Sequence, residues 1–276
     1  LLMAEDFFAA ATAASGLPTG YARTGRLQPL PDAAAIALAQ TRATNAQTLW
    51  GAQALWQIIP ATDAWHPNSP TGRLVHDTLT ARLHPRLTAR ALGEAIRAKG
   101  GQIIVGDAPD HGPTIHATGV AGLETLSRVL GRRVGDGVKG QAILLAYDAR
   151  DQPQLFVDTL HIVPHHDGTT AIGSTSEHGY TDATNTDAAL DALLQKAFAA
   201  LPLLRTAAIL ERWAGVRPRA SSRAPLLGPW PERPDHYVAN GGFKIGFGMA
   251  PKVARTMVDL VLNQTDTIPA PFRLTP

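Results

Sequence analysis

Cysteine is absent from this 276-residue sequence. Its absence excludes disulfides, cysteine-ligated zinc, iron–sulfur clusters and any cofactor tethered through a thioether within the chain. Charged residues are also few, at 17%, and they form no block of one sign, so the composition argues against a disordered chain. The net charge of +2 is a weak field, which makes nucleic acid a poor candidate for a partner.

Long apolar runs are absent as well. None reaches the roughly 18 residues that a membrane-spanning helix needs. The opening residues carry Glu5 and Asp6 and have no basic stretch, which excludes a secretory signal peptide. We therefore expect a cytoplasmic protein. Because the first residue is leucine, we interpret the chain as one whose natural beginning is missing.

The rest of the chain alternates between helical and strand-like patterns. Apolar periodicity and turn residues predict helices at 4–14, 32–44, 45–57, 88–99, 186–200 and 251–262. Strands are predicted at 21–30, 74–83, 102–106, 114–119, 141–147, 154–163, 170–175, 209–218 and 237–240. Parallel α/β signals fall at 86–120 and 225–265, with an antiparallel meander between them. The chain is thus expected to leave one domain, build a second and return.

A glycine-rich turn lies between the predicted strand at 237–240 and the helix at 251–262. Glycines stand at positions 241, 242, 246 and 248. Such glycines let backbone N–H groups approach a ligand closely, and the N-terminus of the following helix favours anionic oxygens. An ordinary tight connection between a strand and a helix explains the same pattern equally well.

The segment before this turn, residues 212–228, concentrates arginine between prolines and glycines. Arg212, Arg217, Arg219 and Arg223 lie within it, and a proline follows Arg217 directly. A guanidinium binds a carboxylate through two parallel hydrogen bonds, and the proline stiffens the chain that holds it. A solvated basic surface loop is the alternative interpretation.

Five motifs follow one another along the chain. They are TIHATG, VKGQ, HIVPHHDGTTAIGSTSE, WAGVRPRASSRAPLLG and YVANGGFKIGFGMAP. This series resembles the D-amino-acid oxidase and glycine oxidase family of flavoproteins, and the resemblance covers most of the chain from about Tyr21 onward. It implies an α/β fold in which an FAD-binding, Rossmann-like domain of the glutathione-reductase type is interleaved with an antiparallel-sheet α+β substrate domain. The expected FAD-binding segments are 1–16, 81–133 and 207–276, and the expected substrate-binding segments are 17–80 and 134–206.

The resemblance also implies roles for single residues. Arg217 matches the arginine that binds the substrate carboxylate, and Lys244 is a second basic residue that could reach substrate. His161, on a strand near the expected pocket, is the third candidate catalytic residue. The expected flavin contacts are Ala117, Thr118, Gly119, Arg217, Gly241, Gly242, Phe243, Lys244, Ile245 and Gly246.

The implied activity is oxidation of the C–N bond of a small amino acid or secondary amine, with hydride passing to FAD. Oxygen or an electron-acceptor protein would take the electrons. A homo-oligomer is a possible assembly. No G-x-G-x-x-G motif stands near the beginning of the chain, where the family carries its dinucleotide-binding turn, so the FAD-binding domain is expected to be incomplete. A flavin-free scaffold or a small-carboxylate-binding protein is therefore the alternative.

Histidines 161, 165, 166 and 178 lie close to Asp167 in sequence, and histidine with carboxylate suits zinc or iron. We interpret the turn that holds residues 165–167 as solvated and expect no metal. A serine hydrolase is excluded by the lack of a G-x-S-x-G motif.

Overall fold

The computed structural model describes residues 2–275 and divides into two compact units. Unit 1 comprises the chain up to Ile103, then Gln141–Thr175 and Asn185–Ala214. Unit 2 comprises Ile104–Gly140, Ser176–Thr184 and the chain from Gly215 onward. Because each unit is assembled from separated segments, the chain passes between them several times, as the sequence pattern predicts. The predicted assignment of these segments to cofactor and substrate stays a prediction.

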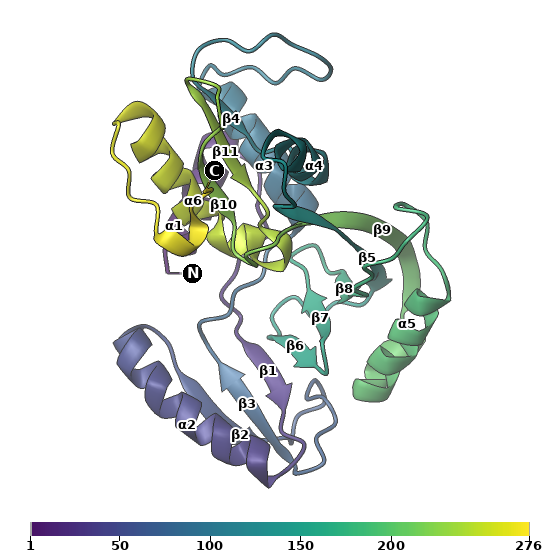
Figure 1. Ribbon diagram of the computed structural model, residues 1–276. Coiled ribbons are helices and arrows are strands. Elements are labelled where there is room, and N and C mark those ends of the chain that lie inside the picture. Colours follow the sequence, from purple (N-terminus) through teal and green to yellow (C-terminus); the bar gives the residue numbers. More distant parts are fainter. Residues whose placement is uncertain (1, 276) are drawn as a thin grey trace. The chain divides into compact units, whose positions relative to one another are not determined.

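Unit 1 is built on a mixed sheet, to which β5 and β9 also belong although their far ends lie in unit 2 (Figure 1). The strands in spatial order are β2 (Trp56–Pro60), β3 (Arg73–Asp77), β1 (Arg26–Pro29), β6 (Gln154–Val157), β7 (Leu160–Pro164), β8 (Thr170–Gly173), β5 (Gly135–Ala146) and β9 (Ala208–Ala220). β1 and β6 are parallel, whereas β6, β7, β8 and β5 form consecutive antiparallel pairs. The predicted antiparallel meander is therefore confirmed. The single strand predicted at 154–163 is wrong, because Asp158 and Thr159 adopt positive φ and turn the chain, so this stretch forms the paired strands β6 and β7.

One face of this sheet makes the core of unit 1. Helix α5 (Ala188–Ala200) packs on β7 and β8, and Asp187 caps it by accepting a 2.9 Å hydrogen bond from the Ala189 N–H. The fully buried core side chains are Leu74, Ile143, Leu145, Leu155, Ile162, Ile172, Leu190 and Leu204. Each such side chain contributes about 1.5–3 kcal/mol on burial. Since strand side chains alternate, Leu144, His161, Val163 and Ala171 point to the opposite, half-buried face.

Three helices complete unit 1. Helices α1 (Ala4–Ser15) and α3 (Pro85–Ala98) pack against each other, and α2 (Ala33–Trp50) packs on β2. The prediction of two helices at 32–44 and 45–57 is wrong. One helix runs through Asn45 and β2 follows it, because the β-branched and aromatic side chains of residues 56–59 pair with β3 instead.

Unit 2 is a three-stranded sheet covered on both faces. Its order is β10 (Leu226–Pro229), β11 (His236–Asn240) and β4 (Thr114–His116), with β4 and β11 parallel as the sequence predicts. Helix α4 (Gly119–Val129) packs over Leu226 and Val238 on one face. Helix α6 (Gly246–Leu262) packs over Leu227 and its neighbours on the other. Both helices therefore meet the carboxyl end of β11, where the glycine turn begins.

The buried strand predicted at 102–106 is not formed. These residues have no regular structure, and Val105 is 96% exposed. An apolar run specifies burial only where a neighbouring strand aligns with it, and β11 pairs with residues 114–116 instead. Short 3-10 helices complete the fold at Gly51–Gln53, Pro202–Thr206, Phe243–Ile245 and Ala270–Phe272.

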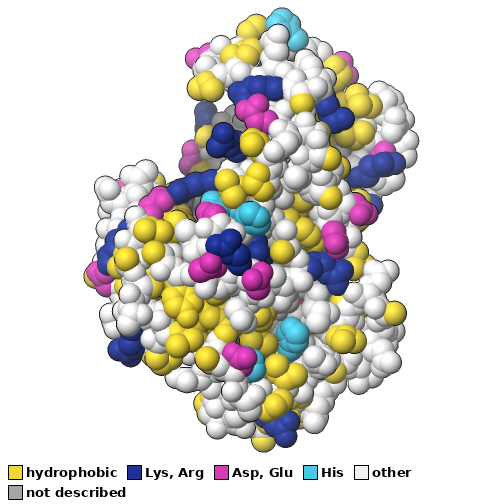
Figure 2. All heavy atoms as spheres, turned by 180° about the vertical axis from the view of Figure 1, so that it is seen from behind, with side chains coloured by type: hydrophobic (Ala, Val, Ile, Leu, Met, Phe, Trp, Pro, Cys, Tyr) yellow, Lys and Arg dark blue, Asp and Glu magenta, His cyan; other side chains and the backbone are white. Residues whose placement is uncertain are grey.

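Charges are spread thinly over the surface. Lysine and arginine side chains stand among acidic ones on the face seen in Figure 2, rather than in a patch of one sign. That face therefore lacks the single-sign field that binds a nucleic-acid backbone. Among the described residues, every helix is too short or too polar to cross a lipid bilayer.

Candidate functional site

A cavity of about 290 Å³ lies in unit 2 at the carboxyl end of β11. Its walls come from the loop after β4, the end of β9 and the glycine turn. They are lined by Ala117, Gly119, Pro218, Pro225, Leu227, Ala239, Asn240, Gly241, Gly242, Phe243, Gly246, Met249, Ala250 and Val253. The carboxyl edge of an open α/β sheet is where such folds bind ligands, so this cavity is the candidate site.

The glycine turn is shaped by close backbone contacts. Gly241 has φ of 78°, and a methyl there would lie 2.8 Å from the Ala220 Cβ. Gly242 forms a backbone bridge with Arg219, and a methyl on it would lie 3.0 Å from the Gly246 Cα. At position 241, only glycine accommodates both the positive φ and the close approach to Ala220 without strain. The turn is thus held tightly against the end of β9.

Asn240 joins the turn to the loop after β4. Its side-chain amide donates to the Gly119 carbonyl at 2.8 Å, and its side-chain oxygen accepts from the Gly241 N–H at 2.7 Å. Gly119 and Ala117 face the cavity, whereas the Thr118 side chain lies against Gly122, where an added methyl would be 2.0 Å from its Oγ1. Thr118 therefore shapes the loop, and its neighbours line the site.

Helix α6 begins at this cavity. The residues of its first two turns that line the walls are Gly246, Met249, Ala250 and Val253. The unpaired N–H groups and the positive end of the helix dipole at such an N-terminus stabilise a nearby negative charge. The short 3-10 helix at Phe243–Ile245 leads into α6, with the Ile245 N–H donating to the Gly242 carbonyl at 3.0 Å.

Arg217 lies on β9 and is half-buried against β5. Its guanidinium occupies the space of the missing Gly140 side chain, where a methyl would lie 1.9 Å from Nη1. Burial lowers the pKa of Arg217, although the charge of Glu177 works in the opposite direction. The Glu177 carboxylate also lies 3.9 Å from the Nζ of Lys139, which is 3% exposed. Two cations and one carboxylate thus share this part of unit 2.

Lys244 adds a third cation. Its Nζ lies 5.6 Å from the centre of the Phe243 ring, and the Arg219 guanidinium lies 5.5 Å from the same ring. Burial, followed by repulsion from the Arg217 charge, lowers the pKa of Lys244. A bound anion would offset this repulsion between Lys244 and Arg217. The arrangement is therefore suited to a carboxylate or another small anion.

Of the predicted cofactor contacts, the cavity is lined by Ala117, Gly119, Gly241, Gly242, Phe243 and Gly246. Thr118, Arg217, Lys244 and Ile245 belong to the same unit but are not among the residues that line this cavity. His161 belongs to β7 in unit 1 and pairs with Gly173 on β8. The centre of its ring lies 4.7 Å from that of Phe156. Its catalytic role stays a prediction. Sequence reasoning missed Asn240 and Glu177 as site residues. Glu177 closes the motif GSTSE, and that position was its only signal.

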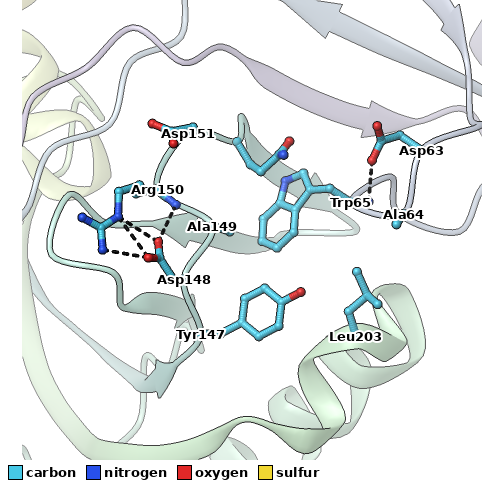
Figure 3. Close-up of a pocket in the computed structure, with 10 residues that line it drawn as sticks. Asp63, Ala64, Trp65, Tyr147, Asp148, Ala149, Arg150, Asp151 and Leu203 are labelled. Atoms are coloured by element: carbon cyan, nitrogen blue, oxygen red, sulfur yellow. Dashed lines mark hydrogen bonds and ion pairs between the residues drawn. The ribbon is translucent and has the colours of Figure 1, made fainter.

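A larger hollow of about 410 Å³ lies in unit 1 (Figure 3). Trp65 and Tyr147 stack in it with ring centres 6.0 Å apart. Its polar groups serve local structure, since the Trp65 indole donates to the Pro153 carbonyl, Asp63 accepts from the Trp65 N–H, and Asp148 is paired with Arg150. Larger volume therefore does not make it the better candidate, and the unit 2 cavity has the glycine turn and the start of α6 in its walls.

The chain is similar to known proteins in sequence and in fold. The family model described as FAD dependent oxidoreductase matches residues 2–260. Glycine oxidase of Pseudomonas aeruginosa is 34% identical over 137 residues, which are 49% of this chain and 38% of that protein. The chain thus aligns with less than half the length of this curated relative.

Solved structures have the same fold. Glycine oxidase from Geobacillus kaustophilus superposes with a TM-score of 0.82 at 20% identity, over 99% of this chain and 80% of that one. Iminodiacetate oxidase from Chelativorans sp. BNC1 gives 0.80 at 19% identity, over 99% and 81%.

Proposed function

Because the chain belongs to the FAD dependent oxidoreductase family, we propose that it oxidises the C–N bond of a small amino acid or secondary amine with FAD. Glycine, sarcosine and D-amino acids represent the expected substrate class. The relatives named glycine oxidase and iminodiacetate oxidase support an amine substrate that carries a carboxylate. The absence of cysteine and of a membrane-crossing helix among the described residues is compatible with the cytoplasm, which we keep as the proposed location.

The observation that carries the proposal is the half-buried guanidinium of Arg217, whose charge acts on Lys244 in the glycine turn. Arg217 has Gly140 beneath it, and Pro218 after it lines the same cavity as Gly241 and Gly242. A planar guanidinium in a place partly shielded from water binds a carboxylate through two charged hydrogen bonds. This supports a substrate held by its carboxylate.

The residues of the cavity fit the polar edge of a flavin ring. Glycines at 241 and 242 place no side chain over the backbone of the turn, and α6 starts at Gly246 with its positive dipole end toward the cavity. Ala117 and Gly119 would lie beside the ring, and Lys244 with the N-terminus of α6 would stabilise negative charge on it. When bound, FAD accepts the hydride from the substrate carbon.

The chain's own groups then have three tasks. Arg217 fixes the substrate carboxylate. It thereby orients the C–H bond for reaction, which is catalysis by proximity and orientation. The apolar wall of Leu227, Met249 and Val253 keeps water out of the cavity and strengthens the electrostatic contacts. His161 is kept as a proposed third residue that faces substrate.

Anaerobic reduction of the protein-bound flavin tests this proposal. After reconstitution with FAD, the protein is expected to lose its visible flavin absorbance on addition of glycine, sarcosine or a D-amino acid. Reoxidation by air would identify an oxidase, and reoxidation only by an artificial electron acceptor would identify a dehydrogenase. Failure to bind FAD, or to be reduced by any member of a broad amine panel, would support the flavin-free scaffold instead.

Carboxylate binding is expected to weaken at high pH through Lys244. Its pKa lies below the ordinary value of 10.5, because of burial and the Arg217 charge, so the ammonium is lost as pH rises through that lowered pKa. Losing a cation at the site reduces affinity for an anion, and affinity is full below the transition. Titration with acetate, which has no amine to titrate, measures this from pH 7 upward. Lys244→Met should remove the transition, and an unchanged profile in that variant would assign it to another group.

A further inference from the structure

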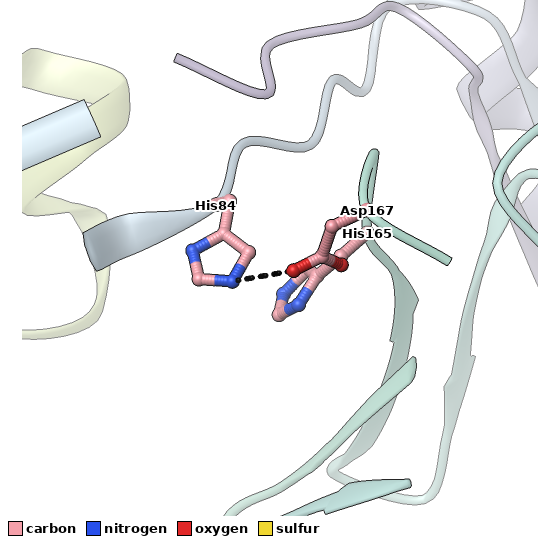
Figure 4. A group of neighbouring side chains, drawn as sticks. All are labelled: His84, His165 and Asp167. Atoms are coloured by element: carbon pink, nitrogen blue, oxygen red, sulfur yellow. Dashed lines mark ion pairs between the residues drawn. The ribbon is translucent and has the colours of Figure 1, made fainter. Parts of the chain in front are cut away.

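We propose that His84, His165 and Asp167 in unit 1 form a binding site for one divalent ion of the zinc class. The three residues come from two elements that are far apart in sequence (Figure 4). His84 precedes α3, and the other two lie on the turn between β7 and β8. Their ligand atoms all lie within 4.8 Å of one another.

The spacing matches the coordination of zinc. Two ligand atoms, each about 2.1 Å from a tetrahedral zinc ion, are separated by about 3.4 Å. The Nε2 of His84 and the Oδ2 of Asp167 are 3.4 Å apart. The imidazoles of His84 and His165 are largely buried, at 9% and 5% exposed, with ring centres 4.4 Å apart. Buried imidazoles beside one carboxylate are the ligand types that zinc, cobalt and iron prefer.

The turn prepares two of the ligands. The Thr169 hydroxyl donates to the Oδ1 of Asp167 at 2.7 Å and lies 3.2 Å from the Nδ1 of His165. Because the hydroxyl proton is given to the carboxylate, the Nδ1 of His165 must donate to the hydroxyl oxygen. His165 is then protonated on Nδ1 and has its free lone pair on Nε2. A metal-binding imidazole has this tautomer when its other ring nitrogen donates a hydrogen bond to a neighbouring group. The Thr169 N–H holds the same carboxylate oxygen at 3.1 Å.

A cavity of about 280 Å³ adjoins both histidines. Its other walls are Pro85, Arg86, Leu144, Ala171, Glu211 and Trp213. Three protein ligands beside an open space leave a fourth position for water or a small ligand, which is the pattern of an accessible zinc site. The ion would connect the start of α3 to the β7–β8 turn.

Two neighbours limit the affinity. The Nδ1 of His84 accepts a long, 3.4 Å hydrogen bond from the Leu87 N–H. A metal ion on Nε2 would require the ring proton to be on Nδ1, and this hydrogen bond would be lost. The Arg82 guanidinium interacts electrostatically with Asp167 and repels a cation. We therefore expect binding that a strong chelator reverses.

A second group, Asp110, His116 and His236 in unit 2, is the weaker candidate. The Nε2 of His116 and the Nδ1 of His236 are 2.9 Å apart and hydrogen-bonded to each other. Arg233 donates to Asp110 at 2.9 Å, which places a positive charge inside the group. Its ligand atoms are thus already used by one another.

Calorimetric titration with Zn²⁺ tests the proposal on the full chain after treatment with EDTA. One ion per chain is expected, with Co²⁺ giving the visible bands of a four-coordinate nitrogen and oxygen site. Asp167→Asn and His165→Gln should each weaken binding at least tenfold. His166→Ala, on the same turn but exposed and outside the group, should bind as the unsubstituted protein does.

Three results would overturn the assignment. They are no stoichiometric binding by the unsubstituted protein, binding unchanged in Asp167→Asn, and binding lost in His116→Ala but kept in Asp167→Asn. Melting in EDTA identifies a variant that has failed to fold. Because Asp167 is 41% exposed at its side chain, the asparagine variant decides if His165→Gln is unstable.

Discussion

Replacing Arg217 with alanine is expected to weaken the binding of small carboxylates by about 30- to 700-fold. The change removes a bidentate, charge-assisted contact at a half-buried position, and such contacts are worth about 2–4 kcal/mol. Titration with acetate or glycolate, followed by the flavin spectrum or by calorimetry, gives the affinity directly. FAD should stay bound, because the turn at 241–246 does not require this guanidinium to form.

Arg212 provides the matched control for this change. It lies on the same strand, five residues earlier, and its guanidinium pairs with Asp191 at 2.7 Å on the surface. An exposed pair contributes little, so Arg212→Ala should change carboxylate affinity less than about twofold. Equal affinities in Arg217→Ala and Arg212→Ala would remove Arg217 from the substrate site and would leave the carboxylate to Lys244 or Lys139.

The elements that sequence predicts well are those specified by local signals. The helix at Ala188–Ala200 has its cap in Asp187 and was predicted nearly to the residue. The meander was predicted as a pattern, but the hairpin inside 154–163 was missed because its turn residues, Asp158 and Thr159, include neither glycine nor proline. Helix α4 was missed because it starts with two glycines, at 119 and 122, which conceal the apolar stripe of Leu123 and Leu126. Strand β10 was missed because half of it is Gly228 and Pro229, which are unusual inside strands.

The candidate site divides along the same line. Arg217 and the glycine turn could be proposed as site residues because residue type, spacing and order along the chain indicate them, and their roles stay predictions. The Gly140–Arg217 contact could not be predicted, because it depends on how β5 and β9 align across 77 positions of sequence. Likewise, Asn240 reaches Gly119 only because β11 and β4 pair in parallel. Alignment of distant strands is set by the packed sheet rather than by local sequence pattern.

The role of Gly140 leads to a second large effect, which isolates position from charge. In Gly140→Ala the new methyl would lie 1.9 Å from Nη1, 2.0 Å from Nη2 and 2.2 Å from Cζ of Arg217, so the guanidinium must move. We expect carboxylate affinity to fall at least tenfold although every charged residue is kept, because charged hydrogen bonds need aligned donors. The same acetate titration measures the loss.

Gly215→Ala is the control, since a methyl at 215 meets nothing within 4 Å on the same strand as Arg217. The double variant Gly140→Ala/Arg217→Ala separates the causes. If the methyl acts by displacing the guanidinium, the double variant should bind carboxylate as weakly as Arg217→Ala alone. Urea unfolding should then show that Gly140→Ala lowers the free energy of unfolding less in the Arg217→Ala protein than in the protein that keeps Arg217. Additive losses would mean that Gly140 acts on the site by another route. Non-additivity would identify Gly140 as the residue that makes room for a guanidinium in the fold, and Arg217 as the group whose place it sets.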